Sequence, residues 1–106
     1  MNLYEYNGKD LTAEVVDIVY EDSTIRVERI VSMGHTTPDD FIYDQCDNEL
    51  VCVIEGEAEL LLCDSNKRIF LQEGDTYMIC AGVRHKVTYT SSPCIWLCIF
   101  EKRSNI

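Results

Sequence analysis

Short β-rich runs separated by turn residues constrain the fold of this chain more than any other feature. The first two runs cover residues 15–20 and 24–31, and the later ones cover 41–45, 49–55, 57–63, 68–72, 76–80, 83–90 and 94–100. Turn-forming residues separate them, at Gly56, at 64–66, at 73–75 and at 91–93. Runs so short and so closely spaced predict an all-β sandwich or barrel.

The chain has 106 residues, which is the length of one domain. We predict a single domain over 1–106, in which 41–100 form the core of the barrel and 1–40 contribute N-terminal strands and a loop. Residues 1–14 suit either a short helix or an extra edge strand. In the second run Ile25 and Val27 alternate with Arg26 and Glu28, so the charged face of that strand is expected to meet solvent.

Charge and cysteine content restrict the partners and the compartment. The formal net charge is −10, so we expect neither nucleic acid nor an anionic membrane surface as a partner. The six cysteines include no Cys-x-x-Cys pair, which favours buried free thiols over a disulfide framework. The first residues do not resemble a secretory signal and no apolar stretch is long enough to span a bilayer. These features predict a cytoplasmic protein.

Two runs, 50–54 and 60–62, are apolar on both faces, although a free barrel needs only an apolar inner face. We expect a second subunit to cover the outer face, in a homodimer. The alternative is that the N-terminal segment covers it within one chain.

Two segments carry motifs with defined spacing. Glu49 is followed after six residues by Gly56, and Gly74, Cys80, Gly82 and His85 follow the pattern Gly, five residues, Pro, one residue, Gly, two residues, His, with Cys80 at the proline position. In this order and spacing the segments resemble the two motifs of the cupin superfamily. The resemblance covers about residues 41–100 and implies an all-β jelly-roll barrel, the double-stranded β-helix of cupins.

The resemblance also implies a metal site, because cupins hold a metal with three histidines and one glutamate. This chain keeps Glu49 and His85, whereas Tyr43 and Gln45 occupy the places of the usual His-x-His pair. We predict that Tyr43, Gln45, Glu49 and His85 converge at the mouth of the barrel. They would form a weak site for a divalent metal ion, with Zn, Fe, Mn and Ni not distinguished. The alternative is a metal-free cluster in which the four side chains satisfy one another.

The function predicted from these features is the binding of a small molecule in the barrel, with the weak metal site beside it. One alternative is a metal-dependent enzyme of the oxygenase or isomerase type, acting on a small metabolite or sugar derivative. The other is a metal-free dimeric binding module. His35 lies in the polar loop before the barrel, where it is either exposed or able to swing over the mouth as a ligand or proton shuttle. Core packing is the preferred role for Trp96 and Phe100, with stacking on a ligand as the alternative.

Overall fold

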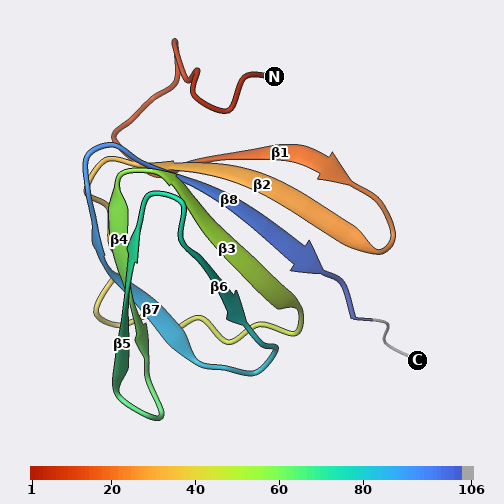
Figure 1. The fold of residues 1–106 in the computed structure, drawn as a ribbon, viewed down its shortest axis with the longest axis vertical. Helices are drawn as coiled ribbons and strands as arrows, with labels where there is room; N and C mark the ends of the chain where they lie inside the picture. Colours follow the sequence, from red (N-terminus) through yellow and green to blue (C-terminus); the bar gives the residue numbers. More distant parts are fainter. Residues whose placement is uncertain (104–106) are drawn as a thin grey trace.

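The computed structural model describes residues 1–103, which form eight strands and no helix (Figure 1). Five strands form one antiparallel sheet, in the order β1-β2-β8-β3-β6, and three form a second, in the order β5-β4-β7. The strands are β1 (Val15–Glu21), β2 (Ile25–Ser32), β3 (Asn48–Glu55), β4 (Glu57–Leu62), β5 (Lys67–Gln72), β6 (Thr76–Ile79), β7 (His85–Thr90) and β8 (Cys94–Glu101). The two sheets face each other and confirm the all-β jelly-roll expectation.

The register of the larger sheet decides which side chains point inward. On β2 and β8 the pairs Arg26–Phe100, Glu28–Cys98 and Ile30–Trp96 share one face, and these residues line the space between the sheets. The pairs Arg29–Leu97 and Val31–Ile95 alternate with them and lie on the outer face. Buried side chains from both sheets close the core around the inner face.

The expectation of a strand over 41–45 is wrong. Only Tyr43 pairs with a neighbouring strand there, exchanging two backbone hydrogen bonds with His85 of 2.9 and 3.0 Å. Pro38 has no N–H to donate, and the Phe41 N–H donates to the carbonyl of Pro38 in a turn. Within 41–45 the backbone therefore pairs with β7 at Tyr43 alone and forms no continuous ladder.

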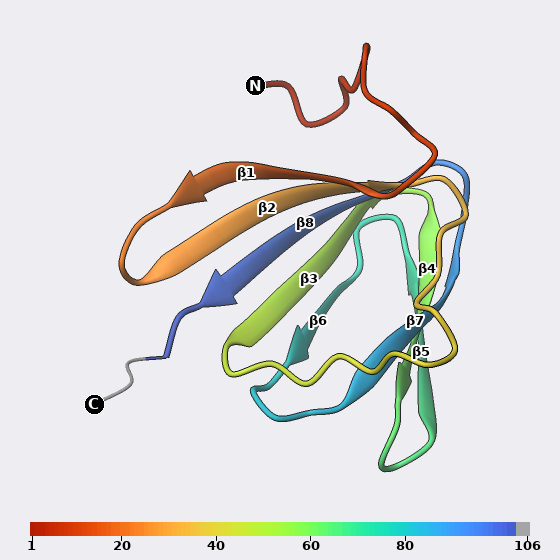
Figure 2. The same ribbon diagram turned by 180° about the vertical axis from the view of Figure 1, so that it is seen from behind.

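Residues 1–14 form neither of the two expected elements, because turns with local hydrogen bonds run through them. Figures 1 and 2 show this segment on the outer side of the five-stranded sheet. Arg29, only 1% exposed, holds it there: its Nη1 donates to the carbonyls of Leu3 (2.7 Å) and Glu5 (3.1 Å), and its Nη2 to Asp17 (2.6 Å). The segment thus covers part of the outer face at β2, and whether it also covers the apolar runs 50–54 and 60–62 stays a prediction.

The homodimer stays a prediction, which sedimentation at micromolar concentration would test. The six cysteines are free thiols, as expected, but only Cys94 and Cys98 are buried, whereas Cys46 and Cys80 are exposed. No helix suited by length and hydropathy to crossing a membrane occurs in the described part of the chain.

Candidate functional site

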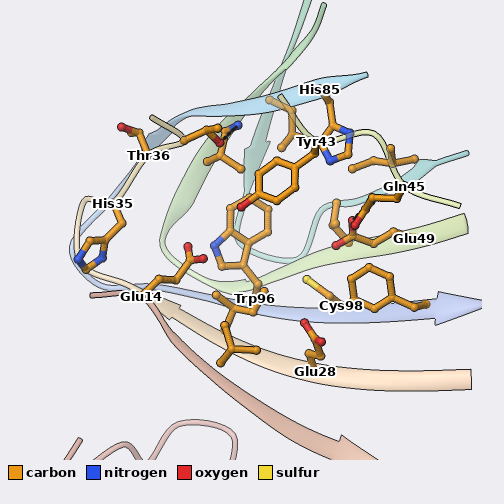
Figure 3. Close-up of a pocket in the computed structure, with 18 of the residues that line it drawn as sticks. Glu14, Glu28, His35, Thr36, Tyr43, Gln45, Glu49, His85, Trp96 and Cys98 are labelled. Atoms are coloured by element: carbon orange, nitrogen blue, oxygen red, sulfur yellow. Dashed lines mark hydrogen bonds between the residues drawn. The ribbon is translucent and has the colours of Figure 1, made fainter. Parts of the chain in front are cut away.

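A cavity of about 580 Å³ lies between the two sheets. Its walls come from the inner faces of β2, β3, β4, β6, β7 and β8, and loop residues 35–38 with Tyr43 and Gln45 border it (Figure 3). Most of the deep wall is apolar, from Val51, Leu60, Ile79, Val87 and Phe100. A cavity of this size and lining is typical of sites for small molecules.

All four residues predicted at the barrel mouth line this cavity. Glu49 lies on the inner face of β3 and is only 7% exposed. Gln45 donates from its Nε2 to Glu49 Oε1 over 2.9 Å. Because a buried carboxylate needs hydrogen-bond donors, this contact fixes the direction of both side chains.

His85 begins β7 and is 4% exposed. Its Nδ1 lies 2.9 Å from the carbonyl oxygen of Val83, so Nδ1 carries the proton and donates it there. In the neutral imidazole Nε2 is then an acceptor. Tyr43 stacks on the imidazole, with ring centroids 5.3 Å apart. Burial, followed by the charges of Glu14 and Glu49, raises the pKa of Tyr43.

The donor set does not fit a tightly held metal ion. Among residues 1–103 no group of three or more His, Cys, Asp or Glu side chains is arranged to hold one. Gln45 turns its amide nitrogen toward Glu49, and the Tyr43 hydroxyl points away from Glu49 in Figure 3. Glu49 and His85 are therefore the two strong metal donors of the cluster.

His35 is not the exposed loop histidine that was expected, and its alternative role as a ligand or proton shuttle stays a prediction. It is half-buried at the edge of the cavity, and both of its ring nitrogens are bonded. Its Nδ1 accepts from the Met33 N–H over 2.9 Å, and Nε2 lies 3.2 Å from the carbonyl oxygen of Thr12. These bonds make His35 a support of the loop.

Three charged side chains that the sequence did not assign to the cavity also border it: Glu14, Arg26 and Glu28. The expectation that Arg26 and Glu28 face solvent is wrong, because the inner face of β2 carries them. The sequence shows that they alternate with Ile25 and Val27, but this alternation does not tell which face of the strand points into the molecule. Glu14 precedes β1 and no pattern marked it.

Two aromatic residues of β8 pack in the core, as preferred, while their stacking on a ligand stays a prediction. Trp96 and Phe100 belong to the hydrophobic core and also line the cavity. The Trp96 Nε1 is buried and has no hydrogen-bond partner among residues 1–103. An unpaired buried N–H is costly, so this position favours an acceptor on a bound molecule or water.

Comparison with known proteins agrees with this architecture. The family model described as Cupin domain matches residues 34–100. A solved structure from Ralstonia eutropha JMP134, named a candidate mannose-6-phosphate isomerase, is 27% identical, with a TM-score of 0.85 over 97% of each chain.

More distant structures show the same fold. A cupin superfamily protein from Desulfitobacterium hafniense DCB-2 is 14% identical, with a TM-score of 0.76 over 90% of this chain and 83% of the other. An RmlC-like cupin from Desulfovibrio desulfuricans is 19% identical, with a TM-score of 0.72 over 94% and 93%. No curated protein matches the chain. On the family match and the jelly roll together, the chain belongs to the cupin family.

Proposed function

We propose that this protein binds a small organic molecule in the barrel cavity. The observation that carries the proposal is the convergence of Glu49, His85 and Tyr43 on one apolar cavity of about 580 Å³. Sites for small molecules combine an apolar wall with a few placed polar groups. Here the wall supplies most of the contact, and the carboxylate and imidazole fix the orientation of the ligand.

Binding is tested by a fragment screen read from ¹H–¹⁵N correlation spectra. Bound fragments should shift the amides of β3, β4 and β7 that border the cavity. Val51→Phe places a larger side chain in the cavity and should abolish these shifts, whereas Leu50→Phe, on the opposite face of β3, should retain them. A screen without any fragment that shifts these amides would contradict the proposal.

A weak divalent-metal site remains part of this proposal. Glu49 and His85 would supply two ligands, and Gln45 a third after its carbonyl oxygen replaces its amide nitrogen at the site. Elemental analysis of untagged protein, purified without added metal, should give less than one ion per chain. Added Zn²⁺ or Mn²⁺ should raise that content in the parent protein and leave it unchanged in His85→Ala. Equal metal content in both proteins would contradict the site.

An isomerase is the second candidate function, favoured by the Ralstonia structure at 27% identity over 97% of each chain. Mannose 6-phosphate, with Zn²⁺ present, is the substrate to assay. Turnover that His85→Ala abolishes would support the enzyme. The absence of turnover at high protein concentration would leave binding as the function.

A further inference from the structure

Carboxylates dominate the charged groups of the cavity. Glu14, Glu28 and Glu49 border it, and among the described lining residues Arg26 is the one lysine or arginine. Figure 3 shows Glu14, Glu28 and Glu49 around the cavity on different elements. The carboxylates therefore surround the cavity and are not confined to one edge.

Arg26 is already committed to neighbouring groups. Its Nε donates to Glu28 Oε2 over 2.8 Å, and its guanidinium carbon lies 4.3 Å from the centre of the Phe100 ring. The Arg26 charge thus compensates Glu28. An anionic ligand would have to break this pair to gain a positive partner.

The other two carboxylates bind neutral donors. Ser32 Oγ donates to Glu14 Oε2 over 2.7 Å, and Gln45 Nε2 donates to Glu49 Oε1 over 2.9 Å. Neither bond cancels the carboxylate charge.

Aromatic faces and one unpaired donor complete the cavity. Tyr43 and Trp96 both line it, and aromatic faces attract cations. Trp96 is 4% exposed, and its Nε1–H has no hydrogen-bond partner in the described part of the chain. In Figure 3 the indole nitrogen is turned toward the side of the cavity where Glu14 lies. An oxygen acceptor placed there on a ligand would satisfy this N–H.

We infer that the cavity selects a small organic cation that also carries a hydroxyl or carbonyl oxygen, in preference to neutral or anionic molecules of similar size. The cationic group would lie near Glu14 and Glu49 against the aromatic faces, and the oxygen would accept from Trp96. This inference rests on the proposed function, because it names the ligand class of the same cavity. The inferred preference for a cation distinguishes this cavity from a site for sugar phosphates, which needs free cationic groups.

The test compares three probes of different charge by ¹H–¹⁵N titration in about 0.15 M salt, where surface attraction is screened beyond about 8 Å. Choline is the cation, 3,3-dimethylbutan-1-ol is its neutral isostere, and mannose 6-phosphate is the anion. We expect choline to bind about tenfold more tightly than the neutral isostere, a difference of about 1.4 kcal/mol. Mannose 6-phosphate should bind most weakly.

Two matched variants locate the source of the selectivity. Glu14→Gln should weaken choline binding about fivefold and leave the neutral isostere unchanged, because it removes one charge near the ligand. Glu73→Gln changes the net charge equally but lies in the turn before Gly74, outside the cavity lining, and should leave both affinities unchanged. Equal losses in the two variants would show that the attraction comes from net charge and would overturn the inference.

The outcomes separate the ligand class from the proposed function. If the neutral isostere or mannose 6-phosphate shifts the cavity amides as strongly as choline, the cavity binds small molecules and only the charge inference is wrong. If choline shifts none of them, the charge inference is also wrong. The fragment screen with Val51→Phe then decides the proposed function independently.

Discussion

Replacing Gly56 by alanine tests the tight turn that joins β3 to β4. Gly56 has a φ of +85°, and a Cβ added there would lie 2.5 Å from the carbonyl oxygen of Pro93 and closer still to Ser91 Oγ. That hydroxyl accepts from the Glu57 N–H and donates to the Pro93 carbonyl, each over 2.9 Å. The left-handed backbone should cost about 1–2 kcal/mol and the displaced hydrogen bonds about 1–2 kcal/mol more. We expect Gly56→Ala to lower the free energy of unfolding by about 2–4 kcal/mol.

Gly82→Ala is the matched control. Gly82 has a φ of +80°, but a Cβ there meets nothing within 4 Å, so only the backbone cost of about 1–2 kcal/mol applies. Urea unfolding at 25 °C, followed by far-ultraviolet circular dichroism, measures both variants, and the slope with urea should stay constant. Equal losses of stability, within about 0.5 kcal/mol, would refute the steric account of the Gly56 turn.

Three other predictions follow from buried polar groups. Arg29→Met should lower the free energy of unfolding at pH 7 by about 2–3 kcal/mol, because Asp17 and the N-terminal segment lose their donor. The hydrogen bond from Arg29, followed by that from Lys9, lowers the pKa of Asp17 from its usual 3.8. The ionised Asp17 therefore stabilises the fold above pH 4, and this contribution is lost as the pH falls further. The difference in the free energy of unfolding between parent and Arg29→Met, measured by urea unfolding, should therefore shrink below pH 4. A difference that stays constant with pH would contradict the stabilising role of the Arg29–Asp17 pair. His85→Ala should cost about 1–3 kcal/mol in EDTA, since the Val83 carbonyl loses its donor; an unchanged unfolding midpoint would argue against that bond. Burial raises the pKa of Cys94 to about 12, so iodoacetamide at pH 8 should label it only after unfolding, and mass spectrometry showing labelling in the native protein would count against its burial.

The strands were predictable because turn residues mark their ends. Predicted and observed limits of β1 and β4 differ by one residue, at Glu21 and at Cys63. The prediction of a strand at 41–45 was wrong for a reason that lies outside this segment. Its pairing with β7 depends on the path of the chain through Pro38 and the turn after it, which local alternation does not report.

The site was predictable only in part. Motif spacing placed Glu49 and His85 at the cavity, and the places of the missing histidines led to Tyr43 and Gln45. The charged wall formed by Arg26 and Glu28 was missed, because charged residues on alternating positions usually indicate a solvated face. Whether such a face is solvated or borders a cavity depends on the opposing sheet, which one strand cannot reveal.

The position of β8 has a consequence for the order in which the protein can fold during synthesis. β8 is made last of the eight strands, yet it lies between β2 and β3 and pairs with both along their length. All three strands of the sheet β5-β4-β7 are synthesised before β8 emerges from the ribosome. The hairpin β1-β2 and the pair β3-β6 remain separate until then, each with an unpaired edge. Nascent chains stopped before residue 94 should therefore be open to aggregation and to chaperones, and the cavity should form only after β8 is released.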